Sequence, residues 1–335
     1  MHVTSKETFV SVVPDLSTQR TWLRSALAAT AVTLIATGCG ATAKDSGWSE
    51  EAISKASGSV AVMVVNSQIG VGENRLAFGL ITSKGELLQN AEGSVQLFRL
   101  AGNETTPAGE HRLRAVSLRE NTNHLHDDGT NHLHDDPIMT MYVTNVELSE
   151  QDWWGAEIHV QAGGKRYEKL RARFFVQQQT TVPPMGVHAP KSTQQTMRDV
   201  KDAAEIDSSR PPRPELHQMT VAEAAVSGKP SVVAFATPAF CQTRFCGPVI
   251  DSVVAPLAKQ YEGRANFLHI EPYSMAEARK GRLVPVPEME QWGLTSEPYL
   301  FVLDREGRIA GKLEGIVEQG EVTAILDRLL GPHGK

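Results

Sequence analysis

The chain has 335 residues, 41% of them hydrophobic, which is enough for about two domains with packed cores behind a leader. Its formal net charge is −6, its isoelectric point is near 6.0, and no basic stripe is visible along the sequence. These values argue against nucleic acid as a partner.

The first predicted element is an export signal. The one long apolar stretch, residues 26–38, follows Arg20 and Arg24 and is too short to span a bilayer comfortably. It ends in small residues directly before Cys39. This pattern predicts a signal peptide over residues 1–38.

The residues before Cys39 resemble the lipobox of bacterial lipoproteins, although Ala36 stands where that family has a larger aliphatic residue. The resemblance implies that Cys39 carries a lipid with acyl chains such as palmitate and becomes the mature N-terminus. The protein would then be held on the extracytoplasmic face of the cell membrane. Residues 39–56 would be the lipid anchor and a small, polar tether. The alternative is simple secretion with an unmodified Cys39.

Residues 57–180 have the pattern of an all-β domain. Short stretches in which apolar residues alternate with others are separated by turns rich in Gly and Asn. The predicted strands are centred on residues 60–64, 76–80, 95–98, 113–116, 139–143, 156–160 and 170–176. Seven short strands at this spacing predict an immunoglobulin-like sandwich without a cysteine pair between its sheets.

Within this domain an eight-residue unit, Asn-His-Leu-His-Asp-Asp and two further residues, occurs twice in succession. In an extended chain both rings of each His-x-His unit point to the same side, so two units could offer nitrogen ligands to Zn²⁺ or Cu²⁺. The predicted metal ligands are His124, His126, His132 and His134. The alternative is a solvated hairpin loop without a specific function.

Residues 181–215 form a Pro-rich segment, predicted as a semi-extended linker. Residues 216–331 then follow the order of an α/β domain: a strand over 231–236, a helix over 247–261, a strand over 265–271, a polar insertion, two further strands and a closing helix over 318–330. This β-α-β, β-hairpin, α order resembles thioredoxin. The predicted fold class is therefore two domains, an all-β immunoglobulin-like sandwich followed by an α/β thioredoxin-like fold.

Two cysteines, Cys241 and Cys246, follow the first strand of this second domain, where thioredoxin-like folds keep their reactive sulfur. A cysteine at a helix N-terminus has its pKa lowered by the helix dipole, so Cys241 is predicted to attack and Cys246, a turn further into the helix, to resolve. An oxidising compartment predicts a reducible disulfide between them. The resemblance also implies that Pro298 is the cis-proline found beside the active cysteine.

Four residues separate the cysteines, whereas thioredoxin has two. This spacing also resembles Q-type peroxiredoxins, in which Thr237 would be one residue too far from Cys241, and Sco-type copper chaperones, for which His269 is the candidate distal ligand. The leading hypothesis is a thiol-disulfide oxidoreductase that acts on extracytoplasmic protein thiols or disulfides and requires no cofactor. The alternatives are a copper or zinc binding or delivery protein, a non-catalytic binding module with a structural disulfide, and a thiol peroxidase.

The lipobox resemblance generates a direct test. Replacing Cys39 with Ser removes the thiol that would carry the lipid, so we expect the variant to be released from the membrane or left uncleaved. Intact-mass analysis of the unaltered protein should show a lipid on a mature chain that begins at Cys39. A cleaved N-terminus without lipid would contradict the anchor.

Overall fold

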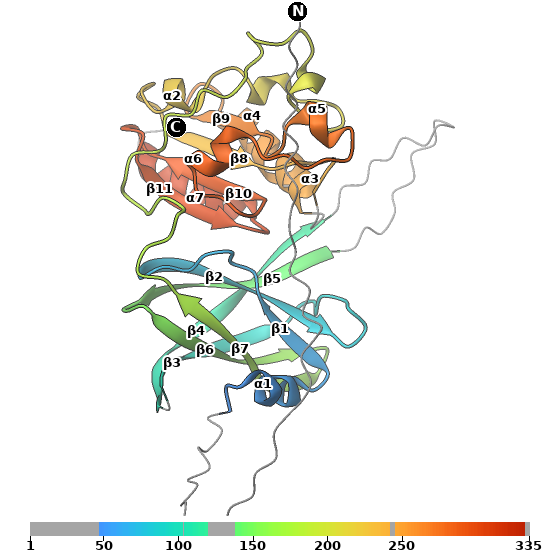
Figure 1. Cartoon of the computed structure of the whole chain (residues 1–335), viewed down its shortest axis with the longest axis vertical. Helices are drawn as coiled ribbons and strands as arrows, with labels where there is room; N and C mark the ends of the chain where they lie inside the picture. Colours follow the sequence, from blue (N-terminus) through green and yellow to red (C-terminus); the bar gives the residue numbers. More distant parts are fainter. Residues whose placement is uncertain (1–46, 103, 120–137, 242–244, 332–335) are drawn as a thin grey trace, which may run out of the picture. The chain divides into compact units, whose positions relative to one another are not determined.

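The computed structural model describes residues 47–102, 104–119, 138–241 and 245–331 (Figure 1). These residues all fall in one compact unit, Ala43–Lys335. The predicted lipid site at Cys39 and the four predicted histidine ligands in the repeat lie outside the described residues. Among the residues described, no helix has the length and apolar character needed to cross a membrane.

The first half of the described chain is a large antiparallel sheet, and each of the seven stretches predicted as strands forms one. The strands are β1 Val60–Val64, β2 Gly72–Thr82, β3 Glu92–Ala101, β4 Glu104–Arg119, β5 Ile138–Leu148, β6 Asp152–Ala162 and β7 Lys165–Val176. Their spatial order is β1-β2-β5-β4-β3-β6-β7. Strand β4 is long enough to pair with β3 up to Leu113 and with β5 from Arg114 onward.

This sheet folds around one apolar core. Side chains alternate between the two faces of a strand, and every strand contributes buried side chains to one cluster. Representative members are Val60, Phe78, Val95, Leu113, Tyr142, Ile158 and Leu170. Other buried residues of β2, β4 and β5, such as Val116 and Met141, belong to a second cluster.

A short helix, α1 (Glu50–Ser57), precedes β1 where the sequence predicted a tether up to residue 56. Ser49 caps it, and acidic residues occupy its first turn, where their negative charges interact favourably with the helix dipole. Trp48 is buried against Phe98, and a Cβ at Gly155 would lie only 2.5 Å from its indole ring. The end of the predicted tether is thus ordered, because a cap and a buried aromatic ring fix it.

The second half contains a four-stranded sheet with helices around it. Its strands are β8 Ser231–Phe235, β9 Asn266–Ile270, β10 Tyr299–Leu303 and β11 Ile309–Glu314. Its helices are α2 Val221–Ala224, α3 Cys246–Val249, the π-helical turn Ile250–Val254, α4 Ala255–Gln260, α5 Met275–Ala278, α6 Pro287–Gln291 and α7 Gln319–Leu330. The strand order is β11-β10-β8-β9, with β9 parallel and β10 antiparallel to β8. This is the β-α-β, β-hairpin, α order predicted from the sequence, so the thioredoxin-like part is confirmed as a fold.

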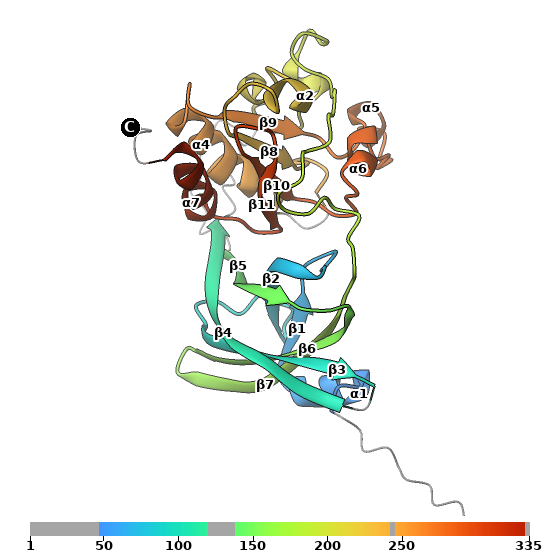
Figure 2. The same cartoon turned by 90° about the vertical axis from the view of Figure 1, so that its left-hand side faces the viewer.

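The central strands β8 and β10 are buried along their whole length, as a strand covered on both faces must be. Alternate residues of these strands point to opposite faces of the sheet. Val232 packs in a cluster with residues of α4 and α7, and Val233 packs in another cluster with Trp292, which directly follows α6. Figure 2 shows α4 and α7 on one side of this sheet and α5 and α6 on the other.

The helical stretch from Cys246 to Gln260 is continuous but changes its winding in the middle. Pro256 has no N–H, so it cannot bond to the carbonyl of Ser252 four residues earlier. That carbonyl accepts instead from the side-chain amide of Gln319 at 2.8 Å. The π-helical turn lies at this point in the helix.

The Pro-rich segment 181–215 packs along the four-stranded sheet. It contains the short 3₁₀ helix Ala203–Glu205, and a second one, Pro214–Leu216, follows at its end. Ala189 donates its N–H to the carbonyl of Gly307, and the buried Ser192 hydroxyl accepts from the indole N–H of Trp292 at 2.9 Å. The segment is therefore held by specific hydrogen bonds to the thioredoxin-like part.

These contacts make Ser192 important for stability. Ser192→Ala leaves the buried Trp292 N–H without an acceptor, and we expect the free energy of unfolding to fall by about 1–3 kcal/mol. Urea unfolding of Ser192→Ala, Trp292→Phe and the double variant measures the coupling. If the two single losses simply add in the double variant, the hydrogen bond does not stabilise the fold.

Candidate redox site and a buried histidine–aspartate cluster

The loop after β8 positions the two cysteines. A turn that begins at Thr237 leads to Cys241, and α3 begins at Cys246. Cys241 therefore precedes the helix, and the prediction that Cys246 lies a turn further into the helix is wrong. Pro248 explains the difference, since a proline is tolerated in the first turn of a helix and not deeper.

The two thiols differ in exposure and contact each other. The side chain of Cys241 is half-buried, whereas Cys246 is fully buried. A hydrogen bond joins the two sulfurs, and the structure holds them as thiols, without a disulfide. The backbone N–H of Thr237 also bonds to the sulfur of Cys246. The pair is thus close enough to exchange a proton or, on oxidation, to form a bond.

Burial sets the acidity of Cys246. It raises the pKa of this thiol far above its usual range, and the contact with Cys241 and the negative charge of Glu297 raise it further. The bond from Thr237 lowers the pKa but does not offset these effects. Although Cys246 begins a helix, it stays protonated at neutral pH. The accessible sulfur is that of Cys241, which is consistent with Cys241 as the attacking thiol.

Pro298, the proline predicted to lie beside the active cysteine, follows Glu297. The Glu297–Pro298 peptide bond is cis, as the thioredoxin resemblance implied. The carbonyl of Pro298 accepts from the N–H of Gly315 at 3.0 Å. The Glu297 carboxylate accepts from the hydroxyl of Tyr273 at 3.0 Å, and burial, Glu297 and both thiols raise the pKa of that hydroxyl. Tyr273 and Glu297 are thus the polar neighbours of the cysteine pair.

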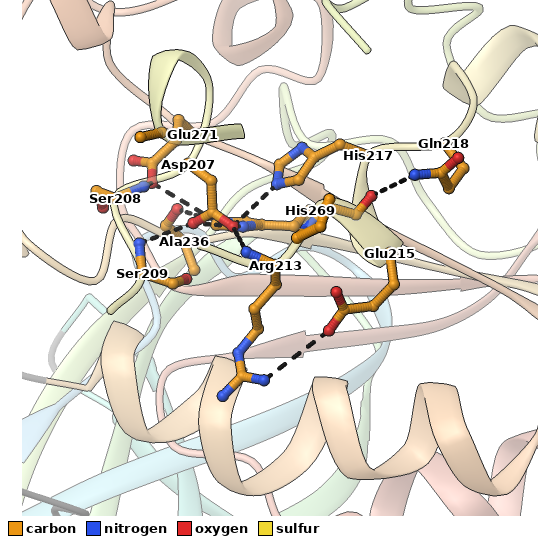
Figure 3. A network of polar contacts seen from close by, with 12 residues as sticks. Asp207, Ser208, Ser209, Arg213, Glu215, His217, Gln218, Ala236, His269 and Glu271 are labelled. Atoms are coloured by element: carbon orange, nitrogen blue, oxygen red, sulfur yellow. Dashed lines mark hydrogen bonds and ion pairs between the residues drawn. The ribbon is translucent and has the colours of Figure 1, made fainter. Parts of the chain in front are cut away.

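A second group of polar side chains lies next to the redox loop, and sequence reasoning did not identify it as a group. The side chains of Asp207, His217 and His269 are buried, and one donor atom from each lies within 4.8 Å of the others (Figure 3). Nε2 of His217 is 3.2 Å from one oxygen of Asp207, and Nδ1 of His269 is 3.6 Å from the other. Neither nitrogen has a hydrogen-bond partner of good geometry. Two imidazoles and a carboxylate with this spacing could hold a metal ion.

Asp207 is held as a carboxylate by the chain around it. The backbone N–H groups of Ser209 and Arg213 each donate to it at 2.7 Å. Burial acts to raise the pKa of Asp207, but the bonds and charge from His217 and His269 outweigh burial and hold it well below its usual range. The group is therefore a buried negative charge.

The two histidines respond differently to their surroundings. Nε2 of His269 is 2.8 Å from the carbonyl oxygen of Ala236. Burial acts to lower the pKa of His269, but Asp207 and Glu271 outweigh it and leave the pKa raised. For His217 burial prevails, and its pKa is lowered. Nε2 of His269 faces the carbonyl of Ala236 and its Nδ1 faces Asp207. The Sco-type alternative, in which His269 would share a copper ion with the cysteines, stays a prediction.

The cluster is connected to the redox loop through Ser208. The N–H of Ser208 donates to the buried Glu271 at 2.6 Å, and its hydroxyl accepts from the N–H of Ala239 at 3.0 Å. Burial raises the pKa of Glu271. Because Ala236 and Ala239 flank the turn that leads to Cys241, the cluster fixes the position of that turn.

Comparisons with known proteins give fold-level likeness only. No family model matches the chain, and no curated protein matches it. Among solved structures, a thiol:disulfide interchange protein of the thioredoxin family from Chlorobium tepidum is 17% identical with a TM-score of 0.30, over 45% of this chain and 100% of that one. A single-residue variant of a superoxide reductase (neelaredoxin) from Ignicoccus hospitalis is 11% identical with a TM-score of 0.19, over 38% of this chain and 86% of that one. At TM-scores this low neither likeness bears on function.

The raised pKa of Cys246 can be tested through Glu297. Glu297→Gln removes a negative charge near the thiol, so the pKa of Cys246 should fall and its alkylation at pH 8 should speed up, about tenfold for each unit by which the pKa falls. The measurement uses iodoacetamide and mass spectrometry on a form with Ser at Cys39 and Cys241. Glu306→Gln, which alters an exposed carboxylate in the β10–β11 turn, is the matched control and should change nothing. Equal rates in both variants would show that Glu297 does not influence this thiol.

Proposed function

We propose that the protein is an extracytoplasmic thiol-disulfide oxidoreductase that uses Cys241 and Cys246. One observation carries the proposal: a half-buried thiol and a buried thiol are hydrogen-bonded to each other between β8 and α3 of a thioredoxin-like fold. The half-buried member can meet a substrate, and the buried member is protected until it is needed. A pair that served only to staple the loop would not need this difference in exposure.

The chemistry follows from the two positions. The thiolate of Cys241 attacks one sulfur of a substrate disulfide, forms a mixed disulfide and expels the other substrate sulfur as a thiolate, which takes up a proton. Cys246 then loses its proton and attacks the sulfur of Cys241. The Cys241–Cys246 disulfide forms and the second substrate thiol leaves. Two protein thiols are oxidised and one substrate disulfide is reduced, and with the opposite redox poise the sequence runs in reverse.

The raised pKa of Cys246 assigns it the second step. A thiol that stays protonated at neutral pH is a poor first nucleophile, because the thiolate is the reactive form. Once Cys241 is bound to a substrate, the contact between the sulfurs places Cys246 beside the bond that it must attack. Pro298 is buried and directly follows Glu297, whose charge acts on Cys246, which supports a place for it beside the cysteine pair.

The cellular setting of the proposal comes from the rest of the chain. Lipid attachment at Cys39 would hold the protein on the outer face of the cell membrane, near exported proteins with thiols or disulfides. The large sheet supports an immunoglobulin-like assignment, because β1-β2-β5-β4 followed by β3-β6-β7 is the strand order ABED and CFG of a constant-type immunoglobulin domain. In this proposal the sandwich lies between the lipid anchor and the redox domain along the chain.

An insulin-reduction assay with dithiothreitol as the electron donor tests the function. We expect the form with Ser at Cys39 to speed insulin precipitation, and the further change Cys241→Ser to reduce the rate to that of dithiothreitol alone, because no attacking thiol remains. Cys246→Ser should instead accumulate a mixed disulfide with the substrate, visible on a non-reducing gel. A rate unaffected by Cys241→Ser would contradict the proposal.

A further inference from the structure

We propose that Asp207, His217 and His269 bind one Zn²⁺ ion, which fastens the redox loop to the rest of the thioredoxin-like part. The three side chains are buried, and Figure 3 shows the rings of His217 and His269 close together beside the Asp207 carboxylate. The site differs from the histidine repeat predicted from the sequence and from the cysteine pair.

The hydrogen bond to Ala236 determines which nitrogen of His269 is available. A carbonyl oxygen only accepts, so Nε2 of His269 must carry the hydrogen that it shares with Ala236 at 2.8 Å. Without a second ring proton Nδ1 is a lone pair, and it faces a carboxylate oxygen 3.6 Å away. Two electron-rich atoms cannot stay face to face unless a proton or a cation lies between them. A metal ion in this place turns both atoms into ligands.

His217 repeats this arrangement on the other oxygen of Asp207. Its Nε2 lies 3.2 Å from that oxygen, yet it is buried without a hydrogen bond of good geometry. Unpartnered buried nitrogens are rare and call for an explanation, such as an ion. Here two of them, on different segments of the chain, face the same carboxylate.

The separations allow one ion between the three side chains. With metal–ligand bonds of about 2.0–2.1 Å, neighbouring ligands of a tetrahedral zinc ion lie about 3.4 Å apart. One ligand atom from each of the three side chains lies within 4.8 Å of the others, so a small movement of the side chains toward the ion would bring them to this spacing. Two imidazoles and one carboxylate also form a ligand set that zinc takes in proteins.

The charges of the site favour a divalent ion as well. Asp207 and Glu271 are both buried, and one oxygen of Glu271 has no hydrogen-bond partner. Buried charges need compensation, and a divalent ion would balance the carboxylate of Asp207. Glu271 lies near Nε2 of His269, 3.9 Å away, on the side opposite the proposed ion. It would therefore orient the ring, as outer partners of metal-bound histidines do.

The ion has a route to the site and a role there. His217 and His269 line a cavity of about 530 Å³, together with Ile206 and Tyr273. Through Ala236, His269 holds the chain directly before Thr237, whose N–H bonds to Cys246. Zinc at this point would fix the position of segment 207–217 relative to the redox loop. It would not take part in the thiol chemistry.

The test measures zinc binding in a protein that lacks the other candidate ligands. Its background has Ser at Cys39, Cys241 and Cys246 and Ala at His124, His126, His132 and His134. Titration calorimetry with ZnCl₂ on the chelator-treated protein should show one equivalent bound, and excess zinc should raise the melting temperature by about 5 °C or more. Adding His217→Gln or Asp207→Asn should weaken binding by at least about 100-fold and remove the temperature shift, while circular dichroism confirms that each variant is folded.

His188→Ala is the matched control, because it removes an exposed histidine from the same Pro-rich segment and should leave zinc binding unchanged. Absence of zinc binding in the background protein would overturn the proposal and leave His269 as a protonated partner of Asp207. Binding that persists unchanged in both ligand variants would overturn it equally. Neither result depends on redox activity, so this proposal and the proposed function can fail separately.

Discussion

The buried carboxylate of Asp207 is the constraint on which the arrangement of the redox domain depends. A charge in the interior is tolerated only when surrounding groups compensate it. Asp207 accepts hydrogen bonds from two backbone N–H groups of the residues that follow it. It also faces His217 and His269. A segment with the composition of a linker thereby becomes part of the domain, and it holds the turn before Cys241 in place.

Burial acts in a second way at the cysteines. Both sulfurs belong to one short stretch of chain, yet the start of α3 places one inside the core and leaves the other half-exposed. Desolvation raises the pKa of the inner thiol more than its place at the helix start could lower it. The division of roles between Cys241 and Cys246 therefore rests on packing, not on the helix dipole from which the sequence argument began.

Elements with strong periodicity could be predicted from the sequence. The seven strands of the large sheet, the strand β8, the long helix after the cysteines and the closing helix were all expected near their observed positions, because alternation and helical spacing are local signals. The cis bond at Pro298 was anticipated through the thioredoxin resemblance. Helix α1 could not be predicted from local sequence pattern. A single cap and the burial of Trp48 against a strand distant in sequence stabilise it.

The histidine–aspartate cluster could not be predicted in this way. Asp207 lies in a stretch rich in proline and serine, His217 ends a 3₁₀ turn, and His269 stands alone in an apolar strand, so no motif spacing connects them. Only the tertiary fold brings the three side chains together. The one local hint was His269, a polar residue inside a strand whose neighbours are otherwise buried and apolar.

The central claim is that the cysteine pair performs redox exchange, and its reduction potential tests this most directly. Equilibration with glutathione buffers, followed by alkylation and mass analysis, gives the fraction of the Cys241–Cys246 disulfide at each ratio. We expect a midpoint reduction potential in the range of exchange proteins, roughly −270 to −120 mV. A midpoint below about −300 mV, the range of structural disulfides, would contradict it.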